Sequence, residues 1–98
     1  MTVTPSGYSF TNLASTATTT IKSGLGVLRK IVVNKPLAAA VVTIYDNTAG
    51  SGTKIGTITM PATLLTDGPY TVLYDAQFDT GLTVVTTVAI MDLTFVYE

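Results

Sequence analysis

The stretch LGVLRKIVVN, residues 25–34, is the clearest strand in the sequence, and AVVTIYD, residues 40–46, follows it as a second. Successive side chains of a strand point to opposite faces, and alternation from Leu25 to Asn34 puts apolar residues on both. This pattern indicates a central strand. Pro36 ends it, because proline cannot donate to a ladder. The two predicted faces are Leu25, Val27, Arg29, Ile31 and Val33, against Gly26, Leu28, Lys30, Val32 and Asn34.

Short β-rich runs continue on both sides of this pair and are separated by turn residues such as Asn47 to Thr53 and Asp67-Gly68-Pro69. Their spacing is typical of a sandwich or barrel of about seven to eight strands. No segment has a long helical pattern. The further runs are Tyr8 to Leu13, Ala14 to Lys22, Lys54 to Met60, Tyr70 to Asp75, Thr83 to Val88 and Asp92 to Glu98, with a bend expected within Ala76 to Leu82.

The length of 98 residues predicts one domain, residues 1–98. Only 11% of the residues are charged and the formal net charge is −1, whereas threonine makes up about a fifth of the chain. Threonine fits a pleated surface and adds a hydroxyl without charge. Little repulsion then keeps copies apart. This composition fits a quiet soluble domain, but it favours a subunit that buries surface against neighbours.

Several partner classes are disfavoured by composition. Five scattered cations form no basic patch for nucleic acid. The longest apolar run, Leu37 to Val42, is far shorter than the roughly 20 residues of a membrane-spanning helix. The first residues, MTVTPSGY, lack a basic segment followed by an apolar run, so we expect no signal peptide. We therefore expect no nucleic acid and no membrane among the partners.

Catalytic machinery is not expected. The chain has no Cys and no His, which removes the common nucleophile–base pairs. Ser23 beside Lys22 is the nearest formal alternative, and a solvated strand end is the simpler interpretation. Asp75 and Asp79 would lie about 13 Å apart in a straight strand, too far for paired carboxylate chemistry. We predict that the protein is not an enzyme and has no cofactor and no metal.

Two further clusters have an ordinary structural explanation. Asp46, Asn47 and Thr48 form an oxygen-rich group that resembles part of a calcium loop, but they match no ligand spacing, and an Asx turn explains them better. Gly50, Gly52 and Gly56 lack the ending of a phosphate loop, which leaves a flexible hairpin loop.

The amino-terminal residues are the candidates for partner contacts. Met1 to Gly7 show no apolar periodicity and contain Pro5, so we interpret residues 1–10 as a possible N-terminal arm. Aromatic side chains on such an arm are suited to contacts. The predicted partner-contact residues are Thr2, Val3, Thr4, Pro5, Tyr8 and Phe10.

Four segments together carry a resemblance, namely GLGVLRKIVVNKPLAAAVVTIYDN, GTKIGTIT, LYDAQFDTGLTVVTT and DLTFVYE. On these segments, from Thr20 to Glu98, the chain resembles small structural proteins of tailed-phage virions, of the decoration or cement type. The resemblance implies a jelly-roll-like β-sandwich on a capsid surface, with a homotrimer as a common state.

The sequence therefore predicts an all-β, single, jelly-roll-like sandwich with antiparallel strands. The expected function is a non-enzymatic capsid decoration subunit, which binds and stabilises the lattice of the major capsid protein and also contacts its own copies. The alternative is a carbohydrate- or receptor-binding module of a tail or fibre, for which exposed aromatic residues would be required. An enzyme is the weakest of the three hypotheses.

Overall fold

The computed structural model describes residues 7–63, 69–87 and 91–98. Within them, eight strands and no helix are found, and no described residue belongs to a helix that is long and apolar enough to cross a membrane. The strands are β1 (Ser9–Leu13), β2 (Thr18–Ser23), β3 (Gly26–Lys35), β4 (Val41–Asp46), β5 (Thr53–Thr59), β6 (Tyr70–Phe78), β7 (Gly81–Thr87) and β8 (Asp92–Tyr97).

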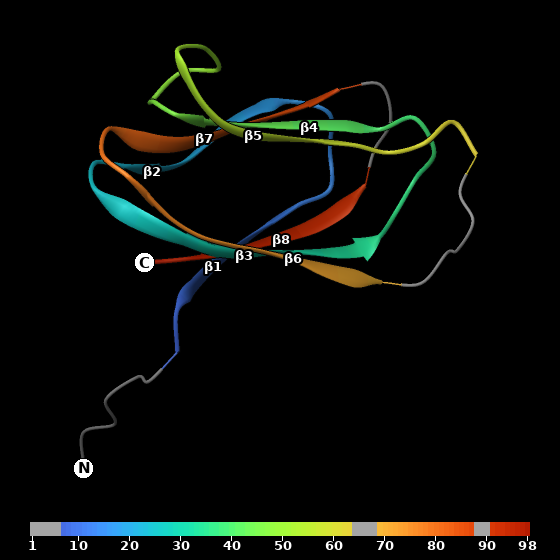
Figure 1. Cartoon of the computed structure of the whole chain (residues 1–98), viewed down its shortest axis with the longest axis horizontal. Helices are drawn as coiled ribbons and strands as arrows, with labels where there is room; N and C mark the ends of the chain where they lie inside the picture. Colours follow the sequence, from blue (N-terminus) through green and yellow to red (C-terminus); the bar gives the residue numbers. More distant parts are fainter. Residues whose placement is uncertain (1–6, 64–68, 88–90) are drawn as a thin grey trace.

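Two four-stranded antiparallel sheets pack face to face (Figure 1). One sheet has the order β1-β8-β3-β6 and is called sheet A below; the other has the order β2-β7-β4-β5 and is called sheet B. Each strand lies in the other sheet from the strand before it, except that β4 and β5 are neighbours in sheet B, and the first and last strands pair in sheet A. This order is that of a jelly roll, in which two Greek keys are wrapped together. The predicted fold class is confirmed. The strand order, which the alternation of side chains does not encode, identifies the sandwich as a jelly roll.

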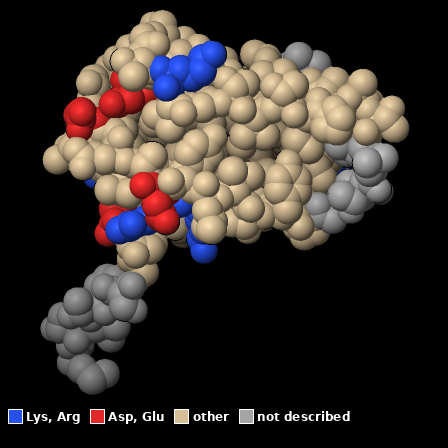
Figure 2. All heavy atoms as spheres, in the orientation of Figure 1, with Lys and Arg blue, Asp and Glu red and all other residues tan. Residues whose placement is uncertain are grey.

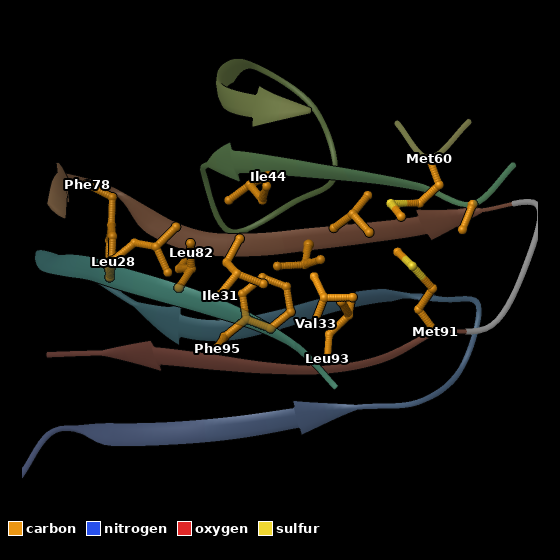
Figure 3. Close-up of a cluster of buried hydrophobic side chains, with 13 residues drawn as sticks. Leu28, Ile31, Val33, Ile44, Met60, Phe78, Leu82, Met91, Leu93 and Phe95 are labelled. Carbon is orange, nitrogen blue, oxygen red and sulfur yellow. The ribbon is translucent and has the colours of Figure 1, made fainter. Parts of the chain in front are cut away.

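The core lies between the sheets (Figure 3). Each sheet contributes alternate, fully buried residues from its two central strands, as expected for a sandwich. Because both inner faces are aliphatic or aromatic, burial of these side chains is the main force that holds the sheets together. The buried residues of the central strands are Leu28, Ile31, Val33, Leu93 and Phe95 in sheet A, and Val42, Ile44, Leu82 and Val84 in sheet B.

The predicted alternation of β3 is wrong at Arg29. The register of β3 shifts between Leu28 and Lys30 against both neighbouring strands. Against β8, Arg29 is the extra residue of a bulge, whereas against β6 the extra residue lies on β6, where Tyr74 and Asp75 oppose Arg29. As a result Leu28 and Ile31 are both buried, and Arg29 leaves the inner face to which strict alternation assigned it. The central position of β3 between β8 and β6 agrees with the prediction.

The bend expected within Ala76 to Leu82 is shorter in the structure. Strand β6 continues to Phe78, whose side chain is fully buried, and β7 begins at Gly81. A Cβ at Gly26 would collide with the Phe78 ring and with the carbonyl oxygen of Glu98. A glycine at this point therefore allows β3 to pass beneath a large aromatic core residue.

Candidate interaction face

The outer face of sheet A carries a row of side chains that crosses all four strands. Phe10 of β1 pairs with Val96 of β8, Val96 pairs with Lys30 of β3, and Lys30 pairs with Leu73 of β6. Directly paired residues project from the same face of a sheet, so these four side chains form one line, called the outer row below.

The ends of the outer row are highly exposed apolar groups. Phe10 is 71% exposed and Leu73 is 74% exposed, and they stand on the two edge strands of sheet A. Between them, half-buried Val96 and the aliphatic stem of Lys30 provide more apolar contact surface. Scattered exposed apolar residues are ordinary, but an aligned set on one sheet face is a candidate interaction site.

A network of amide and carboxylate groups borders the outer row on one side. The Asn12 side-chain nitrogen donates to Asp92 Oδ1 at 2.6 Å, and that of Asn34 donates to the same oxygen at 3.2 Å. Asn34 also donates to Thr94 Oγ1 at 2.9 Å. These bonds tie β1, β8 and β3 together on the outer face, which makes this border a rigid polar rim.

A charged cluster borders the row on the other side. Arg29 donates through Nε to Glu98 Oε2 at 2.9 Å and through a terminal nitrogen to Asp75 Oδ1 at 3.4 Å. Its guanidinium carbon lies 5.0 Å from the centre of the Tyr8 ring. The hydrogen bond that Arg29 donates to Glu98, and after it the one that it donates to Asp75, raise the pKa of the guanidinium, which therefore stays charged.

Charge is unevenly distributed over the molecule. In the view of Figure 2 the charged side chains that can be seen gather toward the end that carries the β6–β7 turn and the carboxyl terminus. The charged cluster of Arg29, Asp75 and Glu98 belongs to this end of sheet A. A partner that covers the outer row would therefore meet the Arg29 ion pairs on one flank and the carboxylate of Asp92 on the other.

The predicted contact residues fall into two groups. Tyr8 and Phe10 are described, and both lie at the outer face of sheet A, with Tyr8 51% exposed. Phe10 is not part of a free arm, because β1 begins at Ser9 and Phe10 pairs with Val96. The remaining predicted contacts, Thr2, Val3, Thr4 and Pro5, lie outside the described residues.

The oxygen-rich group at Asp46 is engaged in turn contacts. The Asp46 carboxylate accepts hydrogen bonds from the backbone amides of Asp79, Thr80 and Gly81, at 2.8 to 3.3 Å. The amides of Asp79 and Thr80 are the main cause of the lowered pKa of Asp46. This carboxylate thus holds the β6–β7 turn.

Asn47 bonds within its own loop, where its side-chain nitrogen donates to the Ser51 carbonyl oxygen at 2.7 Å and its Oδ1 accepts from the Thr48 amide at 2.8 Å. Among the residues that the structure describes, no three acidic side chains gather at a possible metal site.

The two pairs considered for catalysis are not arranged for it. Asp75 has a left-handed φ of 49° and contacts Arg29, whereas Asp79 belongs to the turn and accepts a hydrogen bond from Gln77 at 2.8 Å. Lys22 and Ser23 are consecutive in the ladder between β2 and β7, so their side chains point to opposite faces.

Sequence reasoning missed most of the outer row. Leu73, Val96 and Lys30 were not predicted as contact residues, and neither were Arg29 and Glu98. A signal exists for Leu73, because alternation in Tyr70 to Asp75 places it as a lone apolar residue on the face of Thr71. The alignment with Phe10 depends on strand order and was not accessible.

Comparison with known proteins finds no match: no protein-family model, no curated protein and no solved structure matches the chain. The resemblance to tailed-phage structural proteins gains no support from these comparisons and stays a prediction.

Proposed function

We propose that this protein is a non-enzymatic virion subunit, most concretely a capsid decoration protein, which attaches to the coat lattice through the outer face of sheet A. The observation that carries the proposal is the outer row, in which Phe10 and Leu73 are 71% and 74% exposed on a face that two polar rims frame. Hot-spot residues of protein interfaces are large side chains that become desolvated at the centre of such a frame.

The size of this face indicates how attachment works. Four strands at about 4.8 Å, over about six residues each, give a flat area of about 400 Å². A standard interface buries about 800 Å² on each partner, so this face fills about half of one. The predicted arm, whose contact residues Thr2, Val3, Thr4 and Pro5 precede β1, is the proposed source of the remainder.

The low charge also supports this proposal. Burial of a charged side chain carries a desolvation cost that threonine and aliphatic side chains largely avoid. Because only 11% of the residues are charged, a partner can cover most of the surface at a small desolvation cost. A shell protein that must bury area against the lattice and against its own copies needs this property, and we propose a homotrimer as the assembled state.

The test is co-sedimentation of the full-length protein with empty capsids of the phage that would carry it. The double variant Phe10→Ser/Leu73→Ser should bind at least about 30-fold more weakly, because loss of a hot-spot residue costs about 2 kcal/mol or more. Leu25→Ser is the matched control, because Leu25 is 62% exposed but lies in the β2–β3 turn. Absence of the parent protein from the capsid fraction would reject the decoration role; equal binding of the double variant would reject this face.

Deletion variants test the contribution of the predicted N-terminal arm separately. Deletion of residues 1–6 leaves β1 complete, whereas deletion through Phe10 would also remove two strand residues. Capsid occupancy should fall after the short deletion while the melting temperature is unchanged. Unchanged occupancy would remove the arm from the proposal. Light scattering of the free protein tests the trimer.

A second function, carbohydrate binding in a tail or fibre, rests on one observation. Exposed Phe10 lies two residues from Asn12 on the same face, and an aromatic ring beside amide and carboxylate groups suits a sugar. A glycan array with the parent protein and the Phe10→Ser variant separates this function from capsid attachment.

A further inference from the structure

Arg29 occupies a position that neither the core nor the ladders require. It is the extra residue of a bulge against β8, and it lies where the register with β6 shifts as well, because Tyr74 and Asp75 of β6 both oppose it. Opposite it, Asp75 adopts a left-handed φ of 49°, a conformation that is uncommon for a residue with a side chain. A bulge of this kind re-aims a side chain, and here it brings the guanidinium onto the outer face.

Contacts at that point join all four strands of sheet A. Glu98, which follows β8, and Asp75 of β6 accept hydrogen bonds from the guanidinium. The ring of Tyr8, which immediately precedes β1, lies 5.0 Å from the guanidinium carbon. One planar cation thus meets two carboxylates through its nitrogens and an aromatic ring through its face, a combination that lysine cannot reproduce.

The strand that most needs such an anchor is β1. It has five residues, lies at the edge of sheet A and pairs with β8. Short terminal strands open easily unless they are held at their ends. Asn12 secures the far end of β1 through its bonds to Asp92 and to the Leu93 carbonyl oxygen, and the Arg29–Tyr8 contact is at the near end.

We propose that Arg29 is a positioning residue, which clamps Tyr8 and thereby fixes the start of β1 and the side chain of Phe10 on the outer face of sheet A. The clamp itself is a property of the free protein. Its consequence for attachment rests on the proposed function, since a pre-organised Phe10 loses less conformational freedom on docking.

The chain contains no tryptophan, so Tyr8→Trp creates a single fluorescent reporter at the clamp. An indole ring keeps the cation–π contact. In this background Arg29→Gln should increase the acrylamide quenching of the indole by up to about twofold, because the side chain at position 8 is 51% exposed and loss of the cation–π contact uncovers the remainder. Arg29→Lys should fall between the two. Lys54→Gln, which removes one charge from β5 of the other sheet, should leave quenching unchanged.

Melting temperatures of all variants separate the clamp from a general effect on stability. A merely structural role would lower the melting temperature of the Arg29 variants but leave quenching in the folded state unaltered, and that result would overturn the proposal. Arg29→Lys retains the charge and the long stem at the bulge, so it provides the same test if Arg29→Gln does not fold.

Capsid binding of the same variants then tests the consequence. If the parent protein binds capsids, Arg29→Gln should weaken binding less than Phe10→Ser/Leu73→Ser. If the parent protein does not bind, the proposed function fails, while the quenching result still decides whether the clamp exists.

Discussion

The two outer faces of this sandwich differ in what covers them. On sheet B the β4–β5 loop folds back over the strands, as the upper part of Figure 1 shows. Thr83 Oγ1 donates to the Asn47 carbonyl oxygen at 2.7 Å, and Thr20 Oγ1 donates to that of Thr48 at 3.2 Å. The outer face of sheet A instead carries the exposed side chains of Phe10 and Leu73.

This difference shows how one threonine-rich sequence produces two kinds of surface. Thr83 is fully buried although it faces outward, because the loop covers it; its hydroxyl donates to the loop, and its oxygen lies 3.1 Å from that of Thr20. The hydroxyl groups of Thr20 and Thr83 thus find partners within the chain. Sheet A keeps large apolar groups in solvent, and this exposure is the reason for proposing that a partner attaches to this face.

The largest expected effect on stability comes from the core that the two sheets share. Phe95→Ala removes a fully buried ring from β8 in the shared core. The free energy of unfolding should fall by about 3–5 kcal/mol, which is the usual cost of truncating a buried aromatic residue. Urea denaturation measures it. A loss below about 1 kcal/mol would mean that the two sheets do not depend on this core for their packing.

The second prediction breaks the cover of sheet B. Thr83→Val leaves the Asn47 carbonyl oxygen without its donor, and should reduce the free energy of unfolding by about 1–3 kcal/mol. Thr87→Val is the matched control, because Thr87 lies on the same strand and the same face but is exposed. Equal stability of the two variants in thermal denaturation would show that the loop does not seal this face.

The third prediction concerns the loss of folding stability at acid pH. The amides of Asp79 and Thr80 lower the pKa of Asp46 in the folded state, so the unfolded state takes up a proton first as the pH falls. Stability from Asp46 is therefore complete above the ordinary aspartate pKa of about 3.9, and it is lost between that pH and the lower folded pKa.

The corresponding variant is Asp46→Asn, in which denaturation curves between neutral and acid pH should show a weaker pH dependence in this window. Asp79→Asn, which changes the turn but keeps the backbone amides that Asp46 accepts from, is the control. The same pH dependence in Asp46→Asn and in the parent protein would contradict the assignment.

Sequence reasoning reached the layer architecture because its signals are local. Period-two alternation, proline stops and turn clusters located the strands to within a few residues, and apolar residues on both faces of the stretch from Leu25 to Asn34 identified a central strand. The function of the exposed face was less accessible, since Phe10, Val96 and Leu73 become neighbours only through strand order.

Arg29 shows most clearly what could not be predicted from the sequence. Strict alternation assigned it to the face of Ile31 and Val33, both of which are buried. Where a bulge falls is decided by the register with two partner strands, and those partners come from residues more than 40 positions later in the chain. No window of sequence around Arg29 contains that information.

The smallest expected effect on stability is the most informative about sheet A. Leu73→Thr replaces a side chain that is 74% exposed by the residue type that dominates the other outer face. Threonine suits an exposed strand position, so the free energy of unfolding should change by less than about 0.5 kcal/mol. Attachment to capsids should nevertheless weaken, because the apolar end of the outer row is lost. A clear loss of stability would mean that Leu73 contributes to the fold rather than to a partner, and the contrast between the two outer faces would then lose its functional meaning.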